Sequence, residues 1–272
     1  CKQLEKEGFL ITYLDVDKNG FVNTEDVKKN LREDTILVSI IYAQNEIGTI
    51  QPIREIGLEI KNWKLKIGEK RHIFFHTDAC QATNYLNLKL ETLGVDLLTL
   101  NASKIYGPKG IGILYKKSFV NILPQIFGGG QENRLRSGTL SPALCAGMAE
   151  AFLIAQKNKE KEFERVLKLR DYFIKKVLSE IPTAELNGSQ KNRLPNNANF
   201  HFKDCSAESL LIKLDLNGVA CSSGSACASV FSEPSHVIMA LGKGELAAKS
   251  SIRFSMGRQT NHAQLDRIIN IL

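Results

Sequence analysis

The amino-acid sequence predicts an α/β fold, in which a mainly parallel sheet is followed by a smaller α+β unit. Short apolar segments alternate with helical patterns in the first part of the chain, and polar residues follow several of these segments. A long helical pattern then leads to a second group of short segments. We therefore expect a large unit over residues 1–150, and a linking helix with a small unit over residues 151–272.

The expected strands of the large unit are short and apolar, and glycine or proline separates them from their neighbours. A helix is expected to begin near Pro52, because proline suits a first helical turn. Two strands end in polar residues, RHIFF before HTDACQ and VDLLTL before NASK. The expected strands lie within 8–14, 35–42, 71–81, 95–104 and 110–117.

The second part of the sequence begins with a helical pattern from about Pro142 to Ile181. Strands are expected in NANFHF (197–202) and SSIRFSM (250–256), with helices in AESLLIKLDLNG and EPSHVIMALG. The two units would meet at an interface, which is a common location for ligand sites.

Composition excludes several classes of protein. The chain has 272 residues, of which 43% are hydrophobic and 24% charged, and contains no apolar run long enough to predict a membrane span. Its net charge of +7 is dispersed, and the most basic region (155–176) is interleaved with glutamates. A solvated helix face explains that region better than a nucleic-acid groove does. We expect no direct contact with nucleic acid or membrane.

The six cysteines are spread through the chain without a CxxC pair. This pattern favours reduced thiols in a cytoplasmic compartment over disulfides or structural zinc. The sequence begins at Cys1 rather than methionine, so we expect it to be part of a longer protein, and an organellar location stays open.

The segment DVDKNGFVNTED (15–26) is similar to a calcium-binding EF-hand loop. The preceding residues look like a strand rather than a helix, and the last position is the short Asp26. We interpret the segment as an Asx- and Gly-rich turn between a strand and a helix, and predict no calcium.

Lys104 and Asp78 each follow an apolar strand, as does Asn45, so all three are expected at the carboxyl edge of the sheet. Partial burial of Lys104 would favour the neutral amine that a Schiff base requires. A carboxylate at Asp78 needs a cationic partner, and a pyridinium nitrogen is one. The pair makes pyridoxal phosphate plausible, although a solvated strand-end lysine is the alternative.

Seven longer motifs make the chain resemble the cysteine desulfurases of the class V aminotransferase family, in the group I type. In chain order these motifs are TILVSIIYAQNEIGTIQPI, HTDACQ, SKIYGPKGIGILY, GGGQENRLRSGT, SSGSACAS, EPSHVIMALG and SSIRFSMGR. The resemblance implies a fold-type I pyridoxal-phosphate enzyme. It also implies that residues 1–150 are the cofactor-binding large domain without its N-terminal part, which would leave sheet edges and apolar faces exposed.

The resemblance assigns roles to individual positions. Lys104 resembles the Schiff-base lysine, Asp78 the partner of the pyridine nitrogen, and Gln81 the partner of the phenolic oxygen. Asn45 resembles the asparagine near that oxygen and the substrate carboxylate. Arg253 is similar to the arginine that clamps the carboxylate.

Two further roles concern the phosphate and the second subunit. Most members carry serine and histidine just before the lysine, where this chain has NASK with Ser103 in place of the histidine. Asn101 and Ser103 can still donate hydrogen bonds to the phosphate. Thr139 looks like the threonine that reaches the phosphate of a neighbouring subunit, which implies a homodimer.

Cys227 resembles the catalytic cysteine of the desulfurases. Its thiolate would take sulfur from L-cysteine, leaving L-alanine and a persulfide, and then pass that sulfur to an acceptor protein. The small residues around Cys227 predict a flexible loop suited to both steps. Cys221 is interpreted as a packed thiol rather than a relay. Acceptors would be an iron–sulfur scaffold or a tRNA-thiolation enzyme.

Two alternatives remain open at this stage. One is a selenocysteine lyase or another class V enzyme on the same scaffold. The other is a truncated, inactive relative that acts as a partner-binding subunit.

Overall fold

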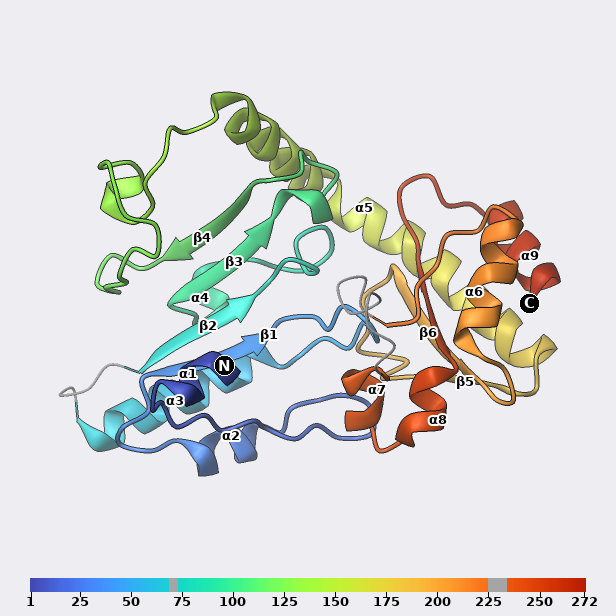
Figure 1. Ribbon diagram of the computed structural model, residues 1–272, viewed down its shortest axis with the longest axis horizontal. Helices are drawn as coiled ribbons and strands as arrows, with labels where there is room; N and C mark the ends of the chain where they lie inside the picture. The colour runs from blue at the N-terminus through green and yellow to red at the C-terminus, as the bar shows by residue number, and fades with distance from the viewer. Residues whose placement is uncertain (69–72, 225–233) are drawn as a thin grey trace.

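The computed structural model describes residues 1–68, 73–224 and 234–272, which form two sheets joined by one long helix (Figure 1). The first sheet contains β1 (Leu37–Ile41), β2 (Phe74–Asp78), β3 (Leu97–Asn101) and β4 (Gly112–Lys116) in that order. The first three strands are parallel and β4 is antiparallel to β3. The predicted mainly parallel sheet is therefore confirmed.

Helices cover one face of this sheet, and the side chains along β2 are accordingly buried at every second position. Phe75 and Thr77 are buried, whereas Phe74, His76 and Asp78 are only partly covered. The buried side chains form a core with α2 (Thr24–Asn30), α3 (Ile53–Ile67) and α4 (Leu90–Leu93). Helix α3 begins directly after Pro52, as predicted.

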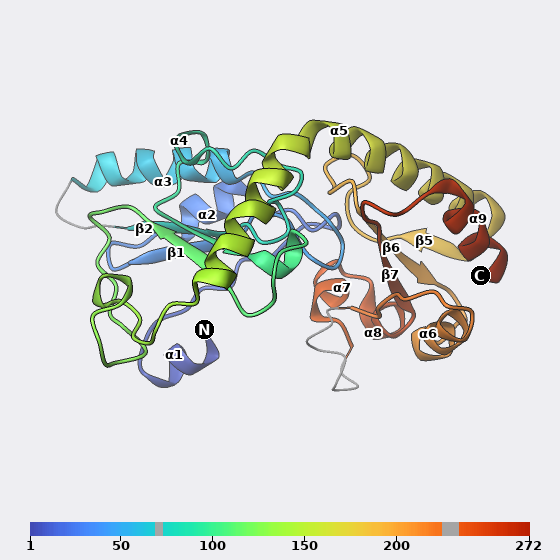
Figure 2. The same cartoon turned by 90° about the horizontal axis from the view of Figure 1, so that it is seen from above.

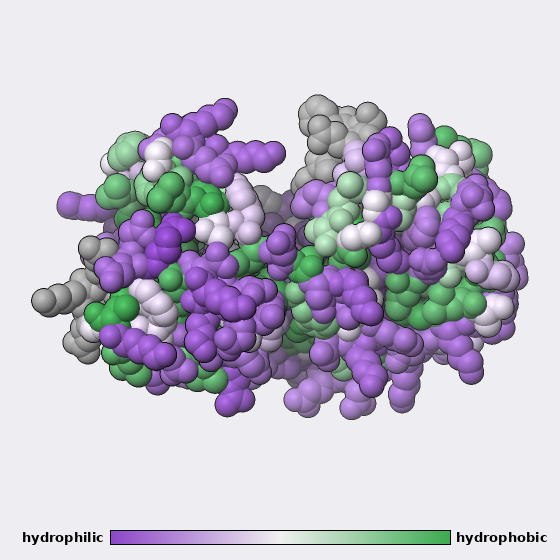
Figure 3. All heavy atoms as spheres, turned by 90° about the horizontal axis from the view of Figure 1, so that it is seen from below, coloured by the Kyte–Doolittle hydropathy of each residue, from purple (hydrophilic) through white to green (hydrophobic). Residues whose placement is uncertain are grey.

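The opposite face of the sheet keeps apolar side chains in contact with solvent. Leu37 pairs with Phe74 on this face and is 50% exposed, and Leu114 pairs with Thr99 and is 49% exposed. Strands β1 and β4 are the edges of the sheet within the described residues. The expected exposure of sheet edges and apolar surface is confirmed. In the space-filling view, hydrophobic patches interrupt a largely hydrophilic surface (Figure 3).

Helix α5 (Pro142–Glu180) passes from the first sheet to the second (Figure 2). It begins at Ser141, whose side chain accepts a hydrogen bond from the Leu144 N–H, with proline in the first turn. The predicted helix is confirmed to within one residue. Because α5 runs through residue 150 without a break, the domain boundary expected there stays a prediction.

The second sheet is antiparallel, with β5 (Ala184–Leu186), β6 (Asn197–Phe202) and β7 (Ser251–Ser255) in that order. Helices α5, α6 (Ala207–Leu216) and α9 (His262–Ile271) supply its core. Phe173 of α5 contacts Phe200 and Phe254 edge-on, with ring centroids 5.8 and 5.2 Å apart. The predicted α+β architecture is confirmed.

The two short helices α7 (His236–Ala240) and α8 (Gly244–Lys249) join the units. Buried Ile238, Leu241 and Ala247 pack with Ile47, which lies just beyond β1. The turn after β1 is thus held against the second unit.

The N-terminal segment differs from the prediction. Residues 8–14 form no strand and follow the short helix α1 (Lys2–Lys6). Leu10 is 73% and Tyr13 60% exposed, and no described strand pairs with this segment. A pattern compatible with a strand does not form one without a hydrogen-bonding neighbour.

The EF-hand-like segment uses its polar groups locally. The Asp17 carboxylate accepts hydrogen bonds from the N–H groups of Asn19 and Phe21, each at 2.9 Å. Asn23 caps α2 by accepting from the Glu25 N–H. An Asx turn leading into a helix is confirmed, whereas the expected strand before it is only an isolated bridge between Val16 and Val22. No helix in the described ranges is both long and apolar enough to cross a bilayer.

Candidate active site

Strands β1, β2 and β3 end at the same edge of the sheet. Tyr42, directly after β1, donates its backbone N–H to the Asp78 carbonyl at 2.8 Å, and Ala79 donates to the Thr99 carbonyl at 3.0 Å. Asn45, Asp78 and Lys104 therefore follow neighbouring parallel strands, as the sequence predicts.

Lys104 ends the short 3-10 helix η1 (Ala102–Lys104), which follows β3 at once. Asn101 caps η1 through its side-chain oxygen, which accepts from the N–H and hydroxyl of Ser103 at 2.9 and 2.8 Å. The Lys104 carbonyl accepts from the Asn84 side-chain amide at 2.7 Å. The Lys104 backbone is therefore held from both sides.

The Lys104 side chain is exposed, so the prediction of partial burial is wrong. Helix η1 projects beyond the end of β3, and no described residue covers the amine. Ser103 also differs from its expected use, because both of its donors go to Asn101.

Asp78 and Lys104 both act on the thiol of Cys80, a residue that sequence reasoning missed. Asp78 accepts the Cys80 N–H at 2.9 Å. Burial, together with the hydrogen bond and charge of Asp78, raises the pKa of Cys80 to about 12, although the Lys104 charge opposes the rise. Cys80 is thus a neutral thiol between the two predicted cofactor residues, and its place in DACQ was the available signal.

His76 occupies the same face of β2 as Asp78 and was also missed. Its ring nitrogens lie 2.8 Å from the Ser39 and Thr99 hydroxyls on the neighbouring strands. Burial lowers its pKa more than the nearby Asp78 charge raises it. A neutral imidazole therefore links the three parallel strands beneath the site.

Arg253 comes from β7 and reaches the first unit. Its Nη1 donates to the Asn45 carbonyl at 3.2 Å, which joins two predicted substrate residues. Its Nε is buried and has no hydrogen-bond partner among the described residues. Burial lowers the pKa of the guanidinium, and the nearby Glu46 charge opposes that change. A half-buried cation with an unused donor is suited to a carboxylate ligand.

Glu46, next to Asn45, connects the two units and was not predicted. It is 2% exposed, and its carboxylate accepts the Ser235 hydroxyl at 2.6 Å. Its carbonyl accepts from the side chains of Asn197 and Asn199, each at 3.0 Å. The sequence signal was a charged residue directly before the segment IGTI, which has no other charge.

The remaining predicted residues make no hydrogen bond to the site residues described above, within the described part of the chain. Gln81 is half-buried in the turn after Cys80. Thr139 is exposed between β4 and α5 and makes no hydrogen bond to the other described site residues. Cys227 and its expected flexible loop lie outside the described residues. Cys221 packs against the second core, and burial raises its pKa to about 11, which supports a packed thiol.

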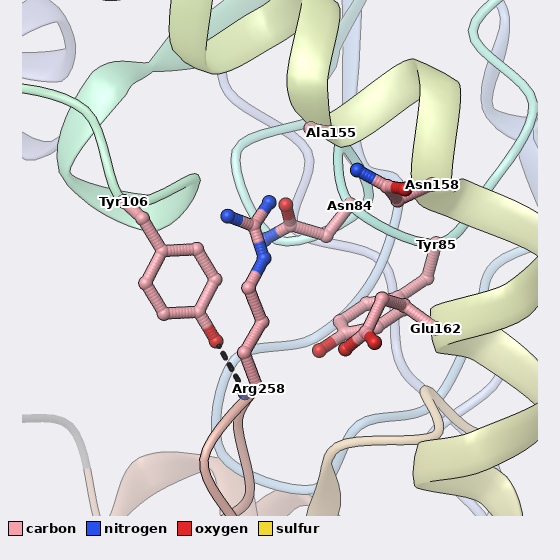
Figure 4. A pocket seen from close by; sticks show the side chains of 7 residues that line it. All are labelled: Asn84, Tyr85, Tyr106, Ala155, Asn158, Glu162 and Arg258. Carbon is pink, nitrogen blue, oxygen red and sulfur yellow. Dashed lines mark hydrogen bonds between the residues drawn. The ribbon is translucent and has the colours of Figure 1, made fainter.

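A small pocket borders the lysine turn where α5 and the segment after β7 meet it (Figure 4). The Arg258 guanidinium lies over the Tyr106 ring in this pocket, with its carbon 4.4 Å from the ring centroid. The lining residues are Asn84, Tyr85, Tyr106, Ala155, Asn158, Glu162 and Arg258.

Comparison with known proteins agrees with this geometry. The family model for class-V aminotransferases matches residues 1–268. A cysteine desulfurase IscS of Dictyoglomus turgidum is 48% identical over 272 residues, which is 100% of this chain and 67% of that protein. Another from Clostridium botulinum is 42% identical and is covered over 66% of its length. The chain thus spans about two thirds of the length of these relatives.

A solved structure described as a NifS-like protein aligns with a TM-score of 0.88 and 31% identity, over 99% of this chain and 68% of that one. A structure described as SspA in complex with cysteine aligns with a TM-score of 0.77 and 31% identity, over 94% and 69%. These matches, together with the mainly parallel sheet, show the fold-type I architecture. The chain belongs to the class-V aminotransferase family and is related within it to the cysteine desulfurases.

Proposed function

We propose that the chain carries the catalytic core of a pyridoxal-phosphate-dependent cysteine desulfurase. It would convert L-cysteine to L-alanine and leave the sulfur as a persulfide on Cys227. The observation that carries the proposal is the Arg253 guanidinium. Its buried Nε has no hydrogen-bond partner in the described part of the chain, while Nη1 is fixed to Asn45 at the carboxyl edge of the first sheet. A carboxylate of an amino-acid substrate would satisfy that donor.

The donor set at the sheet edge fits the cofactor. Asp78 has no cationic partner among the described residues, so its carboxylate is available to the pyridine nitrogen. The Lys104 amine makes no hydrogen bond or ion pair to the described part of the chain, and is available for a covalent bond. When bound, pyridoxal phosphate supplies an electron sink. Gln81 and Asn45 would contact its phenolic oxygen. Asn101 would offer its side-chain amide to the phosphate, and Ser103 its hydroxyl once this turns away from the Asn101 oxygen.

Each protein group then has a separate task. Arg253 and Asn45 hold the substrate carboxylate, which fixes the orientation of the substrate in the site. Lys104 moves protons at the substrate carbon. Cys80 stays a thiol at neutral pH because its pKa is about 12, so it does not compete as a nucleophile.

Assembly with other proteins is part of the proposal. Leu123 and Phe127, in the same connection as Thr139, are 83% and 80% exposed. Large apolar side chains at this exposure support burial against a second copy, with Thr139 reaching the partner's phosphate. The similarity to cysteine desulfurases supports transfer of the sulfur to an acceptor protein, for which we propose an iron–sulfur scaffold or a tRNA-thiolation enzyme. The free thiols of the described cysteines support a cytoplasmic location.

The test is the visible absorption spectrum of the protein with pyridoxal phosphate, beside that of Lys104→Ala. A band that requires Lys104 and changes on addition of L-cysteine is expected. Alanine formation is then compared with Cys227→Ala, which should form no persulfide. Unchanged sulfide or selenide release by Cys227→Ala would favour a lyase, and absence of any Lys104-dependent band would favour an inactive relative.

A further inference from the structure

The turn that carries Lys104 contains a strained residue. Tyr106, two residues after the lysine, has a φ of 64°, in the left-handed region that non-glycine residues rarely adopt. The turn closes around it, because Ile105 and Gly107 both donate their N–H groups to the Ala102 carbonyl, at 3.0 and 2.9 Å. Such a conformation persists only where the surroundings hold it, and it gives reason to ask what the side chain does.

The Tyr106 side chain contacts the segment that follows β7. Its hydroxyl accepts the Arg258 backbone N–H at 3.1 Å, and its ring lies under the Arg258 guanidinium (Figure 4). The fit is close, since a Cβ on Gly257 would lie 2.7 Å from the Tyr106 hydroxyl. The ring is 56% exposed, so burial of apolar surface does not explain this arrangement.

The segment after β7 is itself fixed. Arg165 of α5 donates to the carbonyls of Gly257, Arg258 and Thr260, at 2.9, 3.1 and 2.9 Å. Glu162 pairs with the same guanidinium at 3.1 Å. Tyr106 therefore reaches a rigid point that lies five positions beyond Arg253 in the chain.

We infer that Tyr106 is a positioning residue, and that the Tyr106–Arg258 contact sets the separation between Lys104 and Arg253. These two groups come from different sheets, and the strained turn brings the tyrosine to the segment that continues from the arginine strand. This inference rests on the proposed function, in which the cofactor joins Lys104 and the substrate carboxylate binds Arg253. A shift between them would weaken the binding of a ligand that must reach both.

The experiment compares Tyr106→Phe, which removes only the hydroxyl, with Tyr172→Phe, which removes a hydroxyl bonded to Asp266 between α5 and α9. Losing one hydrogen bond at the contact predicts a roughly 2- to 12-fold rise in KM for L-cysteine. The kcat should change less than about twofold, because Arg253 binds the carboxylate in ground and transition states alike. The absorption band of the bound cofactor and the KM of Tyr172→Phe should match the parent protein.

Gly257→Ala provides a second test, because Tyr106→Phe should partly restore its KM. A general loss of stability would not be restored in this way. Its Cβ would push against the Tyr106 hydroxyl and raise KM, whereas the same change in Tyr106→Phe has no hydroxyl to meet. The double variant should therefore have a lower KM than Gly257→Ala alone. Equal KM in Tyr106→Phe and the parent, or additive effects of the two changes, would overturn the inference.

Amide hydrogen exchange separates this inference from the proposed function. Tyr106→Phe should speed exchange in residues 102–107 and 257–260, with or without catalysis, and unchanged exchange there would overturn the inference. If the parent protein forms no alanine from L-cysteine, the proposed function fails, and the exchange result alone decides whether the contact holds the two segments together.

Discussion

Replacing Arg253 by lysine keeps a positive charge on β7 but removes the planar fork of donors. In the structure, Nη1 is committed to the Asn45 carbonyl at 3.2 Å, and the buried Nε has no partner among the described residues. A lysine amine carries its three N–H donors on one nitrogen, so it cannot hold Asn45 and also offer a carboxylate two parallel donors from separate nitrogens.

The expected loss is that of one charge-assisted hydrogen bond, about 1.5–3 kcal/mol. This corresponds to a roughly 10- to 150-fold weaker binding of the substrate carboxylate. The assay is a titration of the pyridoxal-phosphate-loaded protein with L-cysteine or L-alanine, followed by the change in visible absorption. Arg267→Lys, at an exposed arginine that donates to the Asn217 carbonyl, is the matched control.

Ethylamine distinguishes the carboxylate effect from a general disturbance of the site, because it offers the amine without the carboxylate. Arg253→Lys should weaken the binding of L-cysteine and L-alanine and leave the binding of ethylamine unchanged. Equal affinity of Arg253→Lys and the parent for L-alanine, or an equal loss for ethylamine, would refute the assignment of Arg253.

Three further predictions concern other contacts in the structure. Cys221, with a pKa of about 11, should be alkylated by iodoacetamide at pH 8 far more slowly than exposed Cys145, because only about 0.1% of it is thiolate; equal labelling rates by mass spectrometry would contradict this. Glu46→Gln and Ser235→Ala should show a coupling energy of about 1–3 kcal/mol in urea unfolding, since their contact is a partly buried, charge-assisted hydrogen bond of 2.6 Å; additive losses of stability would contradict this. Asp96→Asn should lower the free energy of unfolding at pH 7, and this loss should disappear in acid. A loss of stability that does not change with pH would contradict the prediction.

The sign of the Asp96 prediction follows from its surroundings. Burial alone would raise the pKa of this carboxyl, but hydrogen bonds from Lys117 and the Phe75 N–H and the charge of Lys64 lower it overall. A lowered pKa in the folded state adds stability above the ordinary value of about 3.9. That contribution is lost as the pH falls through the folded-state value, so parent and Asp96→Asn should converge there in urea unfolding.

Local patterns predicted most of the secondary structure. Helix α5 follows from its helical pattern, which begins at about Pro142, and β2 and β3 follow from apolar runs that end in polar residues. These features depend on neighbours within a few positions. Residues 8–14 carry a similar pattern but find no described strand to pair with, and pairing is a property of distant chain segments.

The sequence by itself determined which chemical groups are present and that Asn45, Asp78 and Lys104 stand at strand ends, because polarity and periodicity are local. Only the tertiary structure decided how these groups meet. It joined Asn45 to Arg253 across 208 positions, buried Glu46 against Ser235, and left Lys104 exposed with Tyr106 held by Arg258. Burial, charge partners and unsatisfied donors arise when separate elements pack together, and no local pattern encodes that packing.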